Sequence, residues 1–272
     1  MHQTREASHL ARLGRLLLVA MIIAFGLALR DAGALRAADP MVPPVSTNGY
    51  PPACHVADTY TKFTKTADWS RTLLDWRLRL PANYRPPKLV PVADAGLSGG
   101  GSVRSVMLVD LREMASAARA ASAPLAVESA YRSYANQIST FNYWVRQYGY
   151  SRALIGSARA GHSEHQLGLA LDFKSLGGGK PWVPIGYDWG TSAAGHWMMV
   201  NAWKYGFVLS YPWGKQATVC YGYEPWHYRY FGRTIAKAIH ASKQAPRVWL
   251  WRHGNSPTQL SPSPSPTPTP ID

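Results

Sequence analysis

Several features common in proteins are scarce or missing from this sequence. No internal repeat is visible among its 272 residues, so a repeat architecture is not expected. The glycine-rich stretch at 96–102 has no Gly-Lys-Ser/Thr after it, which argues against a phosphate-binding loop and favours a flexible one. Charged residues make up 16% of the chain, but hydrophobic residues make up 46%, which excludes a wholly disordered protein and predicts a sizeable core.

Cysteine is also scarce, with Cys54 and Cys220 as the two examples. In an exported protein such a pair predicts a disulfide, whereas two free thiols would be expected in the cytosol. The bridge would pin the segment before Glu224 to the N-terminal part of the chain. On the chain-entropy model it would contribute at most about 5 kcal/mol.

The longest uncharged apolar run lies near the N-terminus, at Leu16–Leu29, and its fourteen residues are short for a membrane span. Arg5, Arg12 and Arg15 precede it, and Ala32-Gly33-Ala34 follows as a small-residue cleavage site. Residues 1–34 are therefore predicted to be a signal peptide, with an uncleaved membrane anchor as the alternative. The protein is expected to be secreted or held in the cell envelope.

Acidic residues are few: 15 Asp and Glu stand against 29 Lys and Arg, a formal net charge of +14. Removal of residues 1–34, with four Arg and two acidic residues, would leave +12. So basic a surface favours anionic partners. Because an exported protein rarely meets nucleic acid, the expected partner is an anionic envelope polymer, and binding to nucleic acid is not expected.

Hydrophobic periodicity and turn residues predict an α+β fold, with a small, mainly antiparallel sheet flanked by helices. Helices are expected at 108–121, 133–148, 193–205 and 234–243, and strands at 125–130, 168–173, 207–211 and 226–230. The predicted parts of the chain are a leader at 1–34, an arm at 35–79, a folded domain at 80–245 and a disordered Ser/Thr/Pro-rich tail at 246–272. A monomer is expected.

Two short clusters carry the chemistry. The first contains His165 and Asp172, and the second contains Glu224 and His227. Alone, each residue has a simpler explanation, such as a hydrogen-bonded core histidine or a strand-end carboxylate. Together, two imidazoles and one carboxylate form a three-ligand set for a catalytic zinc ion and leave Glu224 free to move protons. A straight strand would put His165 and Asp172 on opposite faces, so the chain must bend between them, and Gly168 would allow the bend.

Four ordered motifs resemble the VanY-like D-alanyl-D-alanine carboxypeptidases, zinc peptidases with the hedgehog/DD-peptidase fold. The motifs are Tyr131-Arg132-Ser133-Tyr134 with Gln137, Gly161-His162-Ser163-Glu164-His165 through Asp172, Trp203-Lys204-Tyr205-Gly206-Phe207, and Glu224-Pro225-Trp226-His227-Tyr228-Arg229-Tyr230. The similarity spans roughly residues 80–232, so residues 80–245 are expected to form the zinc peptidase domain. Four motifs in one order are far more specific than any one of them.

The resemblance implies a role for each matching residue. His165, Asp172 and His227 would bind one Zn²⁺ per chain, Glu224 would be the catalytic base, and Arg132 would face the scissile carbonyl. Gln137 and Ser163 match substrate-contacting positions. For Tyr211 and Trp226, lining of a substrate groove and packing in the core remain equally good explanations.

The implied activity is removal of terminal D-alanine from peptidoglycan stem peptides by zinc-activated water. Alternatives on the same polymer are an L,D-carboxypeptidase or an endopeptidase. A non-catalytic, zinc-containing wall-binding module is a different class of protein, and it would not need Glu224 or Arg132. A further alternative, an envelope adhesin driven by the basic charge, would bind the wall in a salt-dependent way and would not respond to a chelator.

Overall fold

The computed structural model describes residues 38–41, 49–182 and 188–255. All of them belong to one compact unit, Ala38–Asp272. The predicted signal peptide and the end of the predicted tail lie outside the described residues. Within those ranges no helix is both long and apolar enough to cross a membrane.

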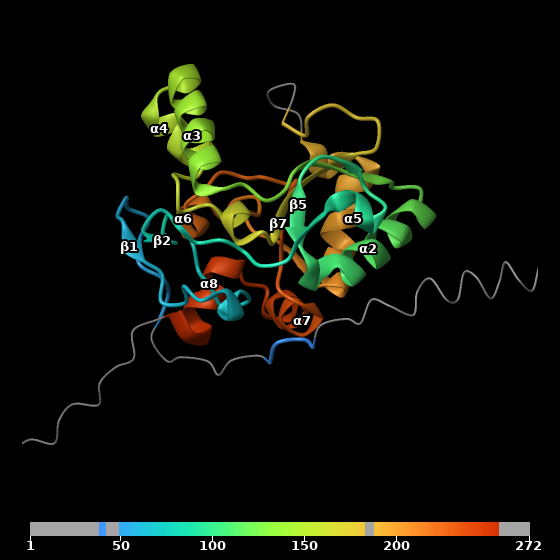
Figure 1. Cartoon of the computed structure of the whole chain (residues 1–272), viewed down its shortest axis with the longest axis horizontal. Helices are drawn as coiled ribbons and strands as arrows, with labels where there is room; N and C mark the ends of the chain where they lie inside the picture. Colours follow the sequence, from blue (N-terminus) through green and yellow to red (C-terminus); the bar gives the residue numbers. More distant parts are fainter. Residues whose placement is uncertain (1–37, 42–48, 183–187, 256–272) are drawn as a thin grey trace, which may run out of the picture. The chain divides into compact units, whose positions relative to one another are not determined.

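The described part of the chain contains short strands and helices (Figure 1). The strands are β1 (Thr59–Tyr60), β2 (Leu78–Arg79), β3 (Leu89–Pro91), β4 (Ser98–Gly99), β5 (Ser102–Arg104), β6 (Leu125–Ser129), β7 (Ala170–Ser175), β8 (Phe207–Leu209) and β9 (His227–Tyr230). The α-helices are α2 (Leu108–Ala120), α3 (Tyr134–Tyr148), α4 (Tyr150–Gly156), α5 (Ala193–Asn201), α6 (Gln216–Val219), α7 (Arg233–Ser242) and α8 (Pro246–Leu250). Single turns of other helix types are η1 (Thr66–Asp68), η2 (Val92–Ala95), η3 (Ser105–Met107), η4 (Glu164–Leu167), η5 (Trp189–Thr191), η6 (Ala202–Tyr205) and η7 (Trp251–Asn255).

The central sheet has five strands in the order β4-β6-β7-β9-β8. Within this sheet only the β4–β6 pair is parallel, so the predicted mainly antiparallel sheet is confirmed. The antiparallel pairing of β7 with β9 sets Asp172 directly opposite His227. Opposed residues on neighbouring antiparallel strands lie close together, so this register alone joins the two chemical clusters of the sequence.

Helices α2 and α5 pack against the sheet and against each other, and α7 packs on β8 (Figure 1). Leu111, Met114 and Ala118 of α2 are 0% exposed and meet the buried side chains of β6 and β7, such as Val127 and Phe173. The spacing of the α2 residues puts one stripe of the helix into the core. This core fixes the strands that carry the site.

The four predicted helices and four predicted strands are present, and their bounds are displaced by at most two residues. The one exception is the predicted helix at 193–205, which divides into α5 and η6. Gly149 ends α3 with φ of +79°, which glycine adopts without strain. The predicted apolar face of α3 is less buried than its spacing indicates, since Ile138 and Tyr148 are 44% and 46% exposed. The expected loop at 96–102 is also wrong in part, because it contributes β4 and the start of β5.

The arm is joined to the rest of the unit by buried polar contacts. Cys54 and Cys220 form the expected disulfide. The buried Arg247 side chain pairs with Asp75 at 2.7 Å and donates to the carbonyl oxygens of Thr218 and Pro52. A buried guanidinium with this many partners holds three distant parts of the chain together.

The boundary predicted at 245 is wrong. Residues 246–255 form α8 and η7 rather than the start of a disordered tail. Val248, Trp249 and Leu250 are at most 3% exposed, and Trp249 and Leu250 pack with Leu73 of the arm and with α7. The segment is ordered because distant residues bury its apolar side chains, which the local composition does not reveal.

Candidate metal and catalytic site

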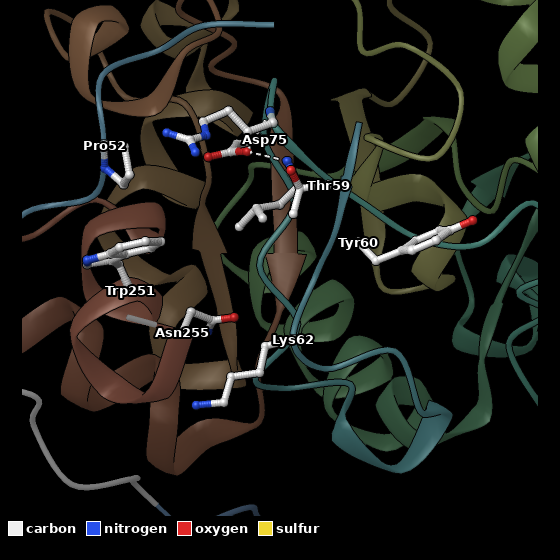
Figure 2. Close-up of a pocket in the computed structure, with 9 residues that line it drawn as sticks. Pro52, Thr59, Tyr60, Lys62, Asp75, Trp251 and Asn255 are labelled. Atoms are coloured by element: carbon white, nitrogen blue, oxygen red, sulfur yellow. Dashed lines mark hydrogen bonds between the residues drawn. The ribbon is translucent and has the colours of Figure 1, made fainter. Parts of the chain in front are cut away.

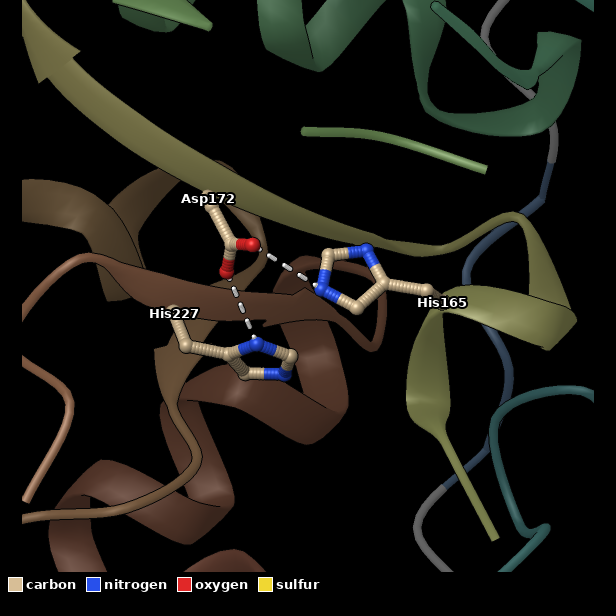
Figure 3. Close-up of side chains that lie close together, drawn as sticks. All are labelled: His165, Asp172 and His227. Carbon is tan, nitrogen blue, oxygen red and sulfur yellow. Dashed lines mark hydrogen bonds and ion pairs between the residues drawn. The ribbon is translucent and has the colours of Figure 1, made fainter. Parts of the chain in front are cut away.

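His165, Asp172 and His227 lie together, buried, with one ligand atom from each within 4.8 Å of the others (Figure 3). The Nε2 atom of His165 is 3.2 Å from Asp172 Oδ2, and Nδ1 of His227 is 3.0 Å from Asp172 Oδ1. The carboxylate therefore stands between the two rings, as Figure 3 shows. The structure brings together the three residues that the sequence analysis named as ligands.

The bend expected between His165 and Asp172 is present at Gly168, whose φ is +69°. His165 lies on η4 rather than on the strand, and Ser163 begins this turn by accepting a hydrogen bond from the His165 amide at 3.3 Å. A side chain at Gly168 would approach Arg104, Leu89 and Pro86 at 3.1–3.2 Å, so the turn is also tightly packed. Glycine satisfies both requirements.

The outer nitrogen of each imidazole is held by an acceptor. His165 Nδ1 is 2.7 Å from the carbonyl oxygen of Ala130, and His227 Nε2 is 3.0 Å from Glu164 Oε2. If each of these nitrogens donates, His165 Nε2 and His227 Nδ1 carry the free lone pairs and face Asp172. Metal-binding histidines usually have their second nitrogen fixed in this way. Two imidazoles and one carboxylate are a donor set that fits Zn²⁺ with a position left for water or substrate.

Glu164 contacts a proposed ligand, although the sequence analysis did not single it out. Its carboxylate is 2.9 Å from Arg229 Nη1 and accepts a hydrogen bond of 2.6 Å from Ser210, in addition to its contact with His227. Burial alone would raise the pKa of Glu164, but Arg229, His227 and Ser210 lower it to about 2. A carboxylate directly before a proposed ligand histidine in an apolar run was the signal available in the sequence.

Glu224 lies on the other side of His227, with Oε2 at 3.8 Å from Nδ1. Burial, with a further contribution from Asp172, raises the pKa of Glu224 to about 8, although His227 and Arg132 oppose the shift. Within the described ranges no side chain makes a hydrogen bond to this carboxylate. A cation bound by the three ligands would lower the pKa of Glu224, because a nearby positive charge favours the ionised form.

Arg132 extends from the segment after β6 toward Asp172, with Nη2 at 3.8 Å from Oδ2. Its Nη1 donates to Gln137 Oε1 at 2.9 Å, and its Nη2 donates to Ser129 at 2.8 Å. Gln137 is 0% exposed and donates its own amide to the carbonyl oxygen of Ala158. The expected substrate contact of Gln137 is therefore not observed: the side chain is enclosed behind Arg132 and orients it.

A groove of about 1,110 Å³ opens over the cluster. Arg132, Ser163, Tyr211, Glu224 and Trp226 line it together with the three proposed ligands. Tyr211 is nearly buried and its ring lies 4.8 Å from that of His227, whereas Trp226 contacts Trp182 at 5.6 Å between ring centroids. Apart from Gln137, all the side chains proposed from the sequence to act on metal or substrate thus face one cavity.

His162 belongs to a different cluster. Its Nδ1 is 2.7 Å from the carbonyl oxygen of Asp75, and its Nε2 is 3.0 Å from the Asp58 carboxylate. Arg159 pairs with the same carboxylate at 3.0 Å. These contacts attach the arm to the segment that leads into η4, and they place His162 away from the proposed ligands.

Sequence comparison gives relatives of one kind. A family model described as VanY, D-alanyl-D-alanine carboxypeptidase, matches residues 101–233. The chain is 37% identical over 172 residues to YodJ of Bacillus subtilis and 30% identical over 182 residues to a D-alanyl-D-alanine carboxypeptidase of Enterococcus faecalis, alignments that cover 61% and 64% of the chain. It spans 62% of the length of each of these relatives.

Solved structures confirm the predicted fold class. The LdcB LD-carboxypeptidase aligns with a TM-score of 0.59 and 31% identity, over 71% of this chain and 94% of its own. A variant of the vancomycin-resistance D,D-pentapeptidase VanY in complex with Zn(II) aligns with a TM-score of 0.56 and 28% identity, over 67% of this chain and 99% of its own. Both similarities extend well beyond the few residues of the cluster.

Proposed function

This chain belongs to the VanY family of D-alanyl-D-alanine carboxypeptidases, and from that premise we propose that it is an exported, zinc-dependent carboxypeptidase. Its substrates would be peptidoglycan stem peptides, from which it removes the terminal D-alanine. One observation carries the proposal: a free buried glutamate and an oriented arginine share a groove with a His-Asp-His cluster. A purely structural metal site would need neither Glu224 nor Arg132.

In this mechanism His165, Asp172 and His227 hold one Zn²⁺ ion per chain. When bound, zinc supplies Lewis acidity that polarises a carbonyl and lowers the pKa of water. Glu224 is free of hydrogen-bonding partners in the described structure and faces the same space, so it takes a proton from the attacking water and delivers it to the leaving amine. No covalent bond between the enzyme and the substrate is required.

Arg132 stabilises the negative charge that develops on the scissile carbonyl oxygen. Its guanidinium is fixed by Gln137 and Ser129 before substrate arrives, which removes the need to order a flexible side chain during the reaction. Ser163 and the other polar groups of the groove would contact the free carboxylate of the stem peptide. Gln137 then contributes through Arg132 and does not contact the substrate.

The size of the groove supports a peptide longer than the two residues at the cleaved bond. Its volume of about 1,110 Å³ is above the range of roughly 300–1,000 Å³ typical of pockets for small molecules. The lining of the groove also includes Trp144 and Tyr148 of α3, and Trp182. An extended stem peptide would occupy this length.

A second candidate activity is removal of D-alanine from a tetrapeptide stem, at an L,D bond. The observation that favours it is the LdcB LD-carboxypeptidase, which has a higher TM-score and identity than the zinc-bound VanY variant. The proposed ligands, base and arginine suit either bond. The choice depends on how the groove accommodates the residue before the cut.

One experiment tests both activities. The chain from residue 38 onward, loaded with Zn²⁺, is incubated with tetrapeptide and pentapeptide stems, with and without a chelator, and the products are identified by mass. We expect chelator-sensitive release of D-alanine from the pentapeptide, whereas release from the tetrapeptide alone would identify the L,D activity. Chelator-insensitive release, or none from either stem, would contradict the proposal.

We further propose that residues 1–34 direct export and that the protein acts as a monomer at the cell wall. The basic charge of the chain supports contact with anionic envelope polymers there. N-terminal sequencing of the protein recovered from the culture medium and envelope fractions tests the first point. Light scattering of the purified protein tests the second.

A further inference from the structure

A second cavity, of about 250 Å³, lies between the arm and η7 (Figure 2). Its lining includes Pro52, Thr59, Lys62, Arg77, Trp251 and Asn255. None of its lining residues lines the groove over the proposed metal site. All of them also lie outside residues 101–233, the stretch that the family model matches.

Positive charge is in excess around this cavity. Lys62 donates to the carbonyl oxygen of Gly254 at 2.9 Å, which leaves two of its three N–H groups for another acceptor. Arg77 is half-buried, and within the described ranges its side chain makes no hydrogen bond or ion pair. Asp75, the carboxylate in the lining, is already neutralised by Arg247 and accepts from the amides of Arg77 and Leu78. Lys62 and Arg77 can therefore each donate to an anion.

Asn255 supplies a buried acceptor that lacks a donor. The residue is 8% exposed, and its amide nitrogen donates to the carbonyl oxygens of Arg71 and Leu250, each at 2.9 Å. Both N–H groups are thus used, which fixes the amide, and Oδ1 remains without a hydrogen-bond partner. Figure 2 shows this oxygen pointing away from η7, toward the side of the cavity formed by β1 and β2. A hydroxyl group of a ligand would satisfy it.

The remaining wall is apolar and flat. Trp251 and Pro52 lie on one side of the cavity in Figure 2, whereas Tyr60 points away from the other labelled side chains. An indole face next to hydrogen-bonding groups suits a ring that is apolar on its face and polar at its edge. The volume is below the range of about 300–1,000 Å³ for drug-sized ligands, so the cavity takes one unit of a polymer and not a long stretch.

We propose that this cavity binds a single anionic sugar unit, carrying a carboxylate or a phosphate, from an extracellular glycan. The sugar ring packs on Trp251, a hydroxyl donates to Asn255 Oδ1, and the anionic group binds one of the two cations of the lining, Lys62 or Arg77. The proposal relies on the proposed function only for the location outside the cell, and the site itself is separate from the catalytic groove. It would hold the enzyme on its polymer while the groove acts on the peptide.

Isothermal titration of the chain from residue 38 onward tests the site with three probes. N-acetylmuramic acid carries a carboxylate, N-acetylglucosamine 1-phosphate carries a phosphate, and N-acetylglucosamine is neutral. We expect at least one anionic probe to bind about tenfold or more tightly than the neutral one, and the tighter of the two identifies the kind of glycan. Equal binding of all three probes, or binding of none, would overturn the proposal.

Two variants locate the binding. Arg77→Met and Lys62→Met keep the aliphatic stems. The variant that removes the cation bound to the anionic group should raise the dissociation constant of the anionic probe about tenfold or more, while kcat/KM on a free stem peptide stays unchanged in both. Lys65→Met is the matched control, because Lys65 is exposed and does not line the cavity. Unchanged affinity in both cavity variants would place the sugar elsewhere and overturn the proposal, even if the hydrolytic activity were confirmed.

Discussion

Glu164 and Glu224 are two buried carboxylates on opposite sides of His227, and they have opposite ionisation behaviour. Glu164 faces Arg229, Ser210 and the Nε2 atom of His227, and its pKa is about 2. Glu224 has one ion-pair partner within the described ranges, His227 at 3.8 Å, and its pKa is about 8. Burial penalises the charged form of both, so the difference comes from their partners.

The comparison separates two functions of the same residue type. A carboxylate whose oxygens are all engaged is a fixed acceptor, and it can orient an imidazole but cannot readily exchange a proton. A carboxylate with few partners can gain and lose a proton in the range where enzymes work. Three predictions test this difference, and a fourth extends it to an exposed carboxylate; they run from the largest expected effect to the smallest.

The largest effect is expected for Glu224→Gln. The variant keeps the size of the side chain but cannot accept a proton, so kcat on a stem peptide should fall by about 10²–10⁴-fold. Bound zinc, measured by inductively coupled plasma mass spectrometry, should remain at one ion per chain, because Glu224 is not a proposed ligand.

Glu128→Gln is the control for this change, since Glu128 also lines the groove but pairs with Lys174 at 2.7 Å. Its kcat should stay within a few-fold of the parent. If Glu224→Gln kept more than a tenth of the parent activity, Glu224 would not be the base.

Glu164→Gln should act on metal affinity and stability. Loss of the charge weakens the acceptor for His227 and leaves Arg229, which is 0% exposed, without its anion. We expect zinc affinity to fall by about 10–100-fold and the free energy of unfolding of the metal-free protein to fall by about 3–5 kcal/mol. Competition with a chromophoric chelator and urea unfolding measure the two quantities.

The matched control is Glu113→Gln, which removes a carboxylate that pairs with Arg233 but is 47% exposed. An exposed pair contributes about 0–1 kcal/mol, so this variant should resemble the parent in both assays. Equal losses of unfolding free energy in Glu164→Gln and Glu113→Gln would mean that burial of an ion pair does not change its contribution to stability.

Ser210→Ala should have a smaller effect of the same kind. It removes the 2.6 Å hydrogen bond to Glu164 but leaves the contacts with Arg229 and His227. A hydrogen bond to a charged group contributes about 1.5–3 kcal/mol, so the free energy of unfolding should fall by that amount in urea. A loss as large as that of Glu164→Gln would show that Ser210, not Arg229, governs the ionisation of Glu164.

The smallest effect is expected at Asp58, an exposed carboxylate that pairs with the buried His162. Burial lowers the pKa of His162, while the hydrogen bond to Asp58 opposes the shift. Because the folded state favours the neutral ring, stability falls as the pH drops below the ordinary histidine value of 6.5. Asp58→Asn should lower the pKa further and make this loss larger between about pH 7 and pH 5, by less than about 1 kcal/mol.

Urea unfolding of the parent and of Asp58→Asn at several pH values measures this difference. The exposure of Asp58, 58% of its side chain, is the reason that the effect should be small. A steeper loss in the parent than in the variant would reverse the assigned sign and contradict the contact between these two residues.

The proposed ligand set could be predicted from the sequence because the order of the four motifs identifies residues that lie close together in space. The spacing of His165 and Asp172 alone does not. Gly168 was expected to bend the chain, and it does so with a φ of +69°. The partners of Glu164 could not be predicted in the same way. Ser210 and Arg229 are 46 and 65 residues away from it and reach it only through the strand register of the sheet.

The fold shows the same limit. Helix α2 was predicted almost to the residue because its apolar stripe is a local pattern. Helix α8 was missed because its burial depends on Leu73, far back in the arm. Gln137 was expected to contact substrate, whereas the hydrogen bonds that enclose it come from Arg132 and from Ala158, in a separate segment of the chain.

The contacts of Arg247 also determine when the arm can fold. Its partners Pro52 and Asp75 are synthesised 195 and 172 residues before it, and Cys54 precedes Cys220 by 166. Contacts of such long sequence separation form late, because the loop between them must close first. The arm emerges early but has no complete binding surface until α8 has followed. Until then the side chain of Leu73 lacks Trp249 and Leu250, which help to bury it in the folded protein.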